Sequence, residues 1–312
     1  MEPNVMPAIS RASFLRLAGA TLLAAASGRA TAREGTMLTR PIPSTGAALP
    51  VVGCGTWRTF DVGPSEAERA PLAEVLRILF EAGGSVIDSS PMYGAAEGVV
   101  GDLLTAMSAH DRAFIATKVW TRGRAEGIRQ MERSFALLQR RRIELMQVHN
   151  LLDWRTHLAT LRDWRRDGRI GLVGITHYTV GAHDELAAVM ASETVDFVQL
   201  NYSIDDRAAE RRLLPLAAER GIAVLVNQPF GGGGLLRGLI GKPLPGWAAE
   251  IDCSSWPQVL LKFILTHPAV TCVIPGTGRP QHMADNVRAG FGAMPDAAMR
   301  ARMVADWEAL RA

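Results

Sequence analysis

The feature that most constrains the fold is an alternation, repeated from residue 50 onward, between short apolar runs and longer segments with helical periodicity. The runs are rich in β-branched and aliphatic side chains and therefore predict strands. They cover residues 50–52, 85–88, 113–117, 144–148, 170–175, 195–200, 222–226 and 270–274. Eight strands that alternate with helices, without a linker, favour one closed parallel barrel over a doubly wound sheet. The sequence predicts an α/β fold, a (β/α)8 TIM barrel, as a single domain over residues 33–312.

The segments between the runs carry helix start signals and apolar stripes. Ser65 and Glu68 form a capping-box pattern. A stripe spaced three and four residues apart follows it, formed by Leu72, Val75, Leu76, Leu79 and Phe80. Ser255 precedes Pro257 at another predicted helix start. We expect the stripes to pack in the core rather than to contact a ligand.

One connection between the predicted elements is unusually long. Residues 229–255 contain four consecutive glycines, Gly231 to Gly234, followed by Pro243 and Pro245. A connection of this length inside a compact domain usually has a function of its own. We therefore expect a lid at about residues 229–255.

Residues 1–32 have the pattern of an export leader. Arg11 and Arg16 precede an apolar, alanine-rich stretch over residues 17–26, and the Ala-Thr-Ala at residues 30–32 has the form of a cleavage site. The sequence predicts a signal peptide that is cut after residue 32.

The leader also bears on where the protein is found. Residues 10–16 resemble the twin-arginine export motif, although Ala12 stands where the second arginine belongs. We expect an exported, periplasmic protein whose mature chain has no integral membrane span. The alternatives are a cytoplasmic protein and a membrane anchor formed by an uncleaved leader.

Charge and cysteine content exclude two classes of function. Three arginines against one glutamate in residues 1–32 account for two of the three net positive charges, so the barrel carries about one. A nearly neutral barrel has no surface for tracking nucleic-acid phosphates. Cys54, Cys253 and Cys272 are too few and too widely spaced for a disulfide framework or a CxxC metal site. We expect them to be small core residues.

Four ionisable side chains lie at or just after the ends of three consecutive predicted strands. Asp88 and Tyr93 follow the second strand, Lys118 the third and His149 the fourth. Each alone suits a structural role, as a cap, a packed aromatic, a surface amine or a core histidine. Because chemistry in such barrels occurs at the carboxyl ends of the strands, the four are expected to converge on one active site.

The residues around these positions resemble a known family. IDSSPMYGAAE is similar to the Asp-x-x-x-x-Tyr-Gly motif of the aldo-keto reductases, ATKVW to their lysine strand and MQVHN to their histidine strand. The resemblance covers roughly residues 42–292 in the family's order. It implies NAD(P)H-dependent reduction of an aldehyde or ketone to an alcohol, without a metal. The catalytic tetrad would be Asp88, Tyr93, Lys118 and His149.

The chemistry of these four residues agrees with that role. Hydride arriving at a carbonyl carbon leaves negative charge on the oxygen, which a proton donor must neutralise. The phenol of Tyr93 has an ordinary pKa of about 10, and a neighbouring ammonium at Lys118 lowers it. Asp88 would hold Lys118, and His149 would orient the carbonyl oxygen.

The resemblance also implies a set of cofactor contacts. They are Gly55, Thr56 and Trp57 beneath the nicotinamide ribose, Thr176, His177 and Gln199 at the carboxamide, Gly276, Thr277 and Arg279 at the phosphates, and Asp285 and Asn286 at the adenine. The chain departs from the family at His177, Gln228 and His282, where asparagine, an aromatic residue and arginine are usual. Arg279 would supply the charge for a 2′-phosphate. We expect NADPH as the cofactor, with NADH as the alternative.

The barrel mouth leaves the substrate unnamed. Its predicted side chains are Trp57, Met92, Trp120, Asn150, Tyr178 and Phe230. Trp57 and Trp120 indicate an apolar, flat-walled pocket for a small-molecule carbonyl substrate. The competing hypothesis is a nucleotide-binding sensing or regulatory module on the same barrel with little turnover, which the intact set of four residues argues against.

Overall fold

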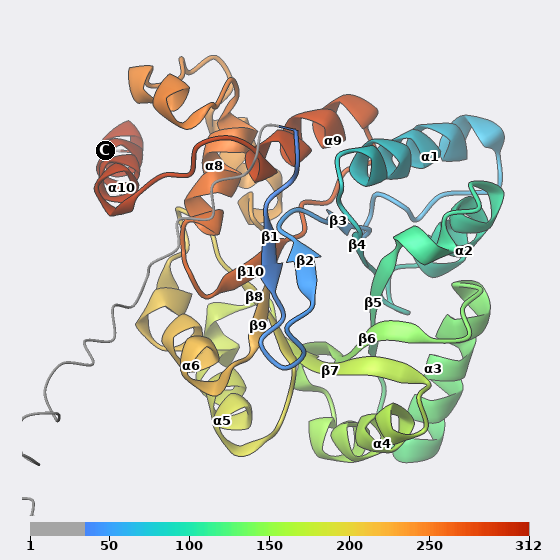
Figure 1. The fold of residues 1–312 in the computed structure, drawn as a ribbon. Coiled ribbons are helices and arrows are strands. Elements are labelled where there is room, and N and C mark those ends of the chain that lie inside the picture. The colour runs from blue at the N-terminus through green and yellow to red at the C-terminus, as the bar shows by residue number, and fades with distance from the viewer. Residues whose placement is uncertain (1–34, 312) are drawn as a thin grey trace, which may run out of the picture. The chain divides into compact units, whose positions relative to one another are not determined.

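Eight parallel strands form one sheet in the order β10-β9-β8-β7-β6-β5-β4-β3 (Figure 1). The computed structural model describes residues 35–311, so the predicted leader lies outside the described residues. The strands are β3 (Cys54–Gly55), β4 (Val86–Asp88), β5 (Phe114–Val119), β6 (Ile143–Val148), β7 (Ile170–Thr176), β8 (Phe197–Asn201), β9 (Ala223–Asn227) and β10 (Val270–Val273). Parallel bridges from Val52 to Val273 and from Gly55 to Gly276 join the two edges of the sheet. The predicted (β/α)8 barrel is therefore confirmed.

The closure of the barrel depends on a close approach of two backbones. A Cβ atom on Gly55 would lie 2.9 Å from the carbonyl oxygen of Ile274, well inside van der Waals contact. Glycine has no Cβ, so it permits this approach. The position of Gly55, at the end of β3, therefore requires glycine for a structural reason.

Helices surround the strands (Figure 1). They are α1 (Glu66–Glu81), α2 (Ala96–Ala106), α3 (Arg124–Leu137), α4 (Trp154–Arg166), α5 (His183–Ser192), α6 (Leu213–Arg220), α7 (Gly234–Gly238), α8 (Trp256–Leu265), α9 (Pro280–Val287) and α10 (Ala297–Arg311). Short 3-10 helices are η1 (His110–Arg112), η2 (His149–Leu151), η3 (Val180–Ala182), η4 (Ala208–Arg211), η5 (Gly231–Gly233), η6 (Gly246–Ile251) and η7 (Arg288–Gly290). Among residues 35–311, no helix is long and apolar enough to cross a membrane.

The first predicted strand, residues 50–52, is wrong in its position. Pro50 ends β2 (Ala48–Pro50), which pairs antiparallel with β1 (Thr39–Pro41), and the first barrel strand begins at Cys54. Ile42 and Leu49 of this hairpin share a buried cluster with Leu145 and other interior residues of the barrel, so the hairpin closes one end of the barrel. The apolar run spans two different elements, and its periodicity does not separate them.

The predicted apolar stripe of α1 is confirmed, and of the two predicted helix caps one forms and the other does not. All five stripe residues of α1 are buried. The Ser255 hydroxyl accepts a hydrogen bond from the backbone N–H of Gln258 at 3.3 Å, which confirms that cap. Ser65 is the N-cap residue of α1, as predicted, but the capping box does not form, because the Ser65 hydroxyl donates to the Glu68 carboxylate at 2.6 Å and makes no cap hydrogen bond. All three cysteines are free and buried, as expected.

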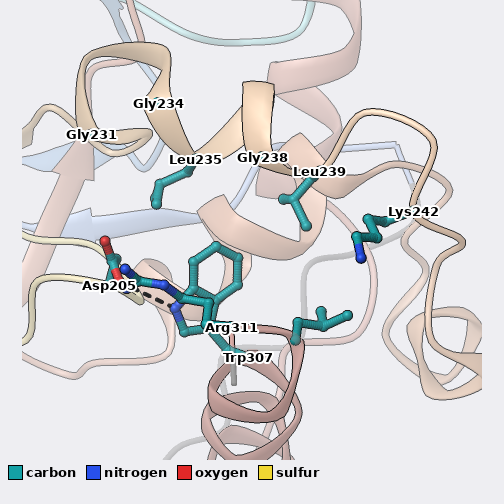
Figure 2. A pocket seen from close by; sticks show the side chains of 10 residues that line it. Asp205, Gly231, Gly234, Leu235, Gly238, Leu239, Lys242, Trp307 and Arg311 are labelled. Atoms are coloured by element: carbon teal, nitrogen blue, oxygen red, sulfur yellow. Dashed lines mark hydrogen bonds and ion pairs between the residues drawn. The ribbon is translucent and has the colours of Figure 1, made fainter.

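The predicted lid, residues 229–255, has helical structure of its own, formed by η5, α7 and η6. Three of its glycines, Gly231 to Gly233, have positive φ angles of 55°, 62° and 87°, which glycine adopts without strain. The far side of α7 faces α10 across a pocket of about 270 Å³ (Figure 2). There Asp205 pairs with Arg311 and accepts a hydrogen bond from Trp307. The helix α10 therefore flanks the predicted lid segment.

Candidate active site

A cavity of about 610 Å³ lies at the carboxyl ends of the barrel strands. Asp88, Tyr93 and His149 line it, together with Phe230 and Leu236 from the predicted lid. Three of the four predicted catalytic side chains thus share one wall, and Lys118 lies directly behind them. Among residues 35–311, no group of three or more His, Cys, Asp or Glu side chains is placed to hold a metal ion.

Lys118 and Asp88 form a buried ion pair beneath the cavity. They come from the neighbouring strands β5 and β4, and both are almost fully buried, at 0% and 3% exposed. The Lys118 ammonium donates to both carboxylate oxygens, at 2.9 and 2.8 Å, and to the carbonyl oxygen of Ser89 at 2.6 Å. A buried ammonium needs such partners, because burial strongly disfavours an isolated charge.

Two glutamines complete the surroundings of Asp88. The Gln199 amide donates to Asp88 Oδ1 at 2.7 Å, and the Gln147 amide donates to the same oxygen at 3.4 Å. Gln199 was predicted as a cofactor contact, whereas Gln147 was not singled out from the sequence. The signal that could have identified Gln147 is a polar residue in the buried part of strand β6, two positions before His149.

The ring of Tyr93 lies beside this ion pair. Its centroid is 5.1 Å from Lys118 Nζ, and its backbone N–H donates to the carbonyl of Ser90 at 3.0 Å in the turn after β4. Burial raises the pKa of Tyr93, and this effect outweighs the neighbouring ammonium, which acts in the expected, lowering direction. Burial alone would lower the pKa of Lys118, but Asp88 and Tyr93 raise it overall. Both groups are therefore protonated before reaction.

His149 faces the same cavity from the end of β6. Its ring meets Tyr93 edge-on, with centroids 5.9 Å apart, and lies 6.3 Å from the Trp120 ring. Its Nδ1 atom is 3.0 Å from the Ser90 hydroxyl oxygen. Burial, followed by the charges of Lys118 and His177, lowers the pKa of His149 to about 2, so the ring is neutral at physiological pH.

The structure brings most of the predicted cofactor residues to this cavity. The lining includes Gly55, Thr56, Trp57, Thr176, Gln199, Gly276, Thr277, Asp285 and Asn286. His177 does not line it, because its Nδ1 accepts from the backbone N–H of Tyr178 at 3.0 Å and its ring stacks on that side chain. Arg279 does not line it either, since its side chain is exposed at the start of α9. His282 of the same helix does.

The cavity also contains polar atoms that have no protein partner. The side-chain oxygens of Asn150 and Asn227 are buried and have no hydrogen-bond donor among the described residues. Both residues line the cavity, and the Asn150 backbone N–H donates to the hydroxyl of Thr176 at 3.2 Å. Buried polar atoms are nearly always hydrogen-bonded, so these oxygens indicate a ligand with N–H donors. A nicotinamide carboxamide, with its NH₂ group, fits that requirement.

Large apolar side chains surround the mouth of the cavity. Trp57, Met92, Trp120 and Tyr178 are 45%, 39%, 39% and 47% exposed, and all four line it, as predicted from the sequence. The guanidinium of Arg58 stacks on Trp57, 4.2 Å from the ring centroid. Exposed apolar surface gathered at one place commonly marks a binding site.

The chain is similar in sequence to known aldo/keto reductases. A sequence model described as the Aldo/keto reductase family matches residues 51–302. The chain is 26% identical over 227 residues to aldo-keto reductase YhdN of Bacillus subtilis, a match that covers 68% of this chain and 66% of that protein. It is 25% identical over 308 residues to the NADH-specific methylglyoxal reductase of Escherichia coli, covering 80% of this chain and 92% of that protein.

Solved structures share the barrel. A Klebsiella pneumoniae aldo-keto reductase in complex with NADPH superposes with a TM-score of 0.71 at 23% identity, covering 86% of this chain and 94% of that one. The holo form of an aldo-keto reductase from Bacillus halodurans gives a TM-score of 0.69 at 21% identity, covering 86% and 96%. At these identities the likeness concerns the fold.

Proposed function

Because the chain belongs to the aldo/keto reductase family, we propose that Asp88, Tyr93, Lys118 and His149 are its catalytic residues. The protein is an NAD(P)H-dependent oxidoreductase that reduces an aldehyde or ketone to an alcohol. The observation that supports this assignment is that the buried Lys118–Asp88 ion pair, the Tyr93 phenol and the neutral His149 imidazole lie next to one another at the cavity. Catalytic function resides in such a site rather than in the fold.

The proton transfer follows from the positions of these groups. When bound, the reduced nicotinamide supplies the hydride. Tyr93 donates its proton to the substrate oxygen as negative charge develops there. The phenolate that remains is stabilised by Lys118, whose ammonium lies 5.1 Å from the ring centroid. Asp88 holds that ammonium in place with two hydrogen bonds. His149, being neutral, orients the substrate oxygen without competing as an acid.

The cofactor would lie along the cavity from the mouth to α9. The Gln199 and Thr176 side chains suit the carboxamide, together with the oxygens of Asn150 and Asn227 that have no donor within residues 35–311. Gly276, Thr277 and His282 suit the phosphates, with Asp285 and Asn286 at the adenine. The Asp285 carboxylate is already held by the Ser255 hydroxyl at 2.7 and 2.8 Å.

NADPH is the proposed cofactor, with NADH as the alternative. A histidine at position 282 can donate a hydrogen bond to a 2′-phosphate, which NADH lacks. Related proteins differ in this respect, since the Klebsiella structure contains NADPH and the Escherichia coli relative is described as NADH-specific. Titration of the protein with each nucleotide decides between them.

The proposed substrate is a small carbonyl compound with a flat, apolar body. Three exposed aromatic side chains line the mouth, namely Trp57, Trp120 and Tyr178. A flat apolar substrate would pack against the faces of these rings. Tyr93 and His149, which both line the cavity, are proposed to contact the carbonyl oxygen of this substrate.

We further propose that residues 1–32 direct export to the periplasm. Their support is the sequence pattern of two arginines, an apolar stretch and a small-residue cleavage site. Cell fractionation, with the N-terminus of the mature protein determined by mass spectrometry, tests this proposal. A chain that begins at Arg33 in the periplasm supports it, and an intact leader on cytoplasmic protein contradicts it.

The reduction itself is tested by single turnover. Purified protein is loaded with NADPH and mixed with a panel of aliphatic and aromatic aldehydes, and nicotinamide oxidation is followed by absorbance. We expect oxidation with at least one aromatic aldehyde and formation of the matching alcohol. Bound NADPH that no carbonyl compound oxidises would contradict the proposed function.

A further inference from the structure

We propose that Ser90 is a positioning residue that fixes the ring tautomer of His149, placing the imidazole proton on Nε2. Nε2 can then donate a hydrogen bond to the substrate oxygen. The inference rests on the proposed function of the site, which it extends by one residue.

The contact between the two side chains is short and enclosed. Ser90 is 0% exposed, and its hydroxyl oxygen lies 3.0 Å from His149 Nδ1. Ser90 belongs to the turn that joins β4 to Tyr93, because its carbonyl oxygen accepts the Tyr93 backbone N–H at 3.0 Å. One short turn thus carries both the proposed proton donor and the partner of the neighbouring imidazole.

The direction of the hydrogen bond follows from the other partner of the hydroxyl. The backbone N–H of Met92 donates to the Ser90 oxygen at 3.4 Å, so that oxygen already accepts one hydrogen bond. Among the described residues, His149 Nδ1 is the acceptor available to the Ser90 hydroxyl hydrogen. If Nδ1 carried the proton instead, the serine hydrogen would be buried without an acceptor, which is costly.

The remaining ring nitrogen is free to act on substrate. A neutral imidazole carries one N–H, so an acceptor at Nδ1 requires the proton at Nε2. Nε2 has no hydrogen-bond partner among the described residues, and His149 lines the cavity beside Tyr93. The depressed pKa of His149 keeps a second proton off the ring, in agreement with this arrangement. His149 therefore orients the substrate oxygen, while Tyr93 alone delivers the proton.

The direct test reads the tautomer by nitrogen-15 NMR of uniformly labelled protein, without substrate turnover. The chain has seven histidines, and the signals lost in His149→Asn identify those of His149. We expect a protonated Nε2 and an unprotonated Nδ1. A protonated Nδ1 in the wild-type protein overturns the proposal and leaves the proposed reduction intact.

The kinetic test removes the serine hydroxyl. We expect Ser90→Ala to lower kcat about tenfold, equal to about 1.4 kcal/mol in the barrier, with an unchanged Kd for the nucleotide. The NMR signals of this variant should show both tautomers. Ser90→Thr keeps a hydroxyl and should restore a single tautomer and most of the rate.

A matched control separates this effect from the general loss of a buried hydroxyl. Ser134→Ala removes a fully buried serine hydroxyl that donates to Glu97 at 3.0 Å, away from the cavity. It should change neither kcat nor the His149 tautomer. A single Nε2–H tautomer that persists in Ser90→Ala, or an equal loss of kcat in Ser134→Ala, contradicts the proposed role.

Discussion

Replacing Asp88 with asparagine tests the structural role of the ion pair and its proposed catalytic role. The Lys118 ammonium is fully buried and donates two hydrogen bonds, at 2.9 and 2.8 Å, to the carboxylate that this change neutralises. The variant keeps the size of the side chain but leaves a buried positive charge without its counter-ion. We therefore expect both the stability and the activity of Asp88→Asn to fall.

The magnitude follows from the burial of the pair. Removing one partner of a buried ion pair typically costs about 3–5 kcal/mol, because the other charge stays buried and uncompensated. At roughly 2–4 °C per kcal/mol for a large domain, the melting temperature should fall by roughly 6–20 °C. The loss of melting temperature in Lys118→Met should lie near the lower end of this range, because the Asp88 carboxylate keeps the hydrogen bonds from the Gln199 and Gln147 amides.

The double variant tests whether the stability loss comes from the uncompensated charge. In Asp88→Asn with Lys118→Met neither charge remains, so the melting temperature should recover most of the loss while activity stays low. Differential scanning calorimetry and single-turnover oxidation of bound NADPH measure the two quantities on the same samples. Additive losses of stability in the double variant, or an unchanged melting temperature in Asp88→Asn, would refute this account of the ion pair.

Three further predictions concern pH, cofactor and substrate. The pKa of His149 is lowered to about 2 from its ordinary 6.5, so the unfolded chain binds a proton that the folded ring does not. The free energy of unfolding should therefore fall as pH drops below about 6.5, with a slope approaching 1.4 kcal/mol per pH unit from this group. In His149→Gln, the melting temperature should change less between pH 7 and pH 4 than it does in the wild-type protein. His282→Arg should strengthen NADPH binding about tenfold in a fluorescence titration, through a charge-assisted hydrogen bond, and leave NADH binding unchanged; an equal gain for both nucleotides would place position 282 away from the 2′-phosphate. Trp120→Ala should raise KM for aromatic aldehydes about tenfold and hardly affect short aliphatic ones, since the ring face would be lost; equal changes across the series would contradict the proposed substrate class.

The barrel, and the convergence of Asp88, Tyr93 and His149 on one cavity, were predictable because two regularities of the chain are strong. Strands buried on both faces appear as continuous apolar runs, and polar residues at their carboxyl ends stand out against them. Asp88 and His149 are visible in this way. The first strand was misplaced because one apolar run serves both the hairpin and the barrel.

The parts that were missed depend on side-chain direction, which spacing does not give. Arg279 directly precedes α9 and His282 lies in its first turn, but only His282 lines the cavity. His177 follows Thr176 at the end of β7, and its ring turns to the backbone of Tyr178. The pKa of Tyr93 was expected to fall beside Lys118, yet its degree of burial, a tertiary property, raises it.

Tyr93 is proposed to supply the proton. Tyr93→Phe removes only the phenol hydroxyl, and Tyr202→Phe is a matched control that removes a hydroxyl bonded to Glu210 at 2.6 Å, outside the cavity. Single-turnover reduction of an aromatic aldehyde by NADPH-loaded protein is the decisive measurement. The account predicts a rate about 100-fold to 10,000-fold lower in Tyr93→Phe, with an unchanged nucleotide Kd and wild-type turnover in Tyr202→Phe. Wild-type turnover in Tyr93→Phe would contradict it.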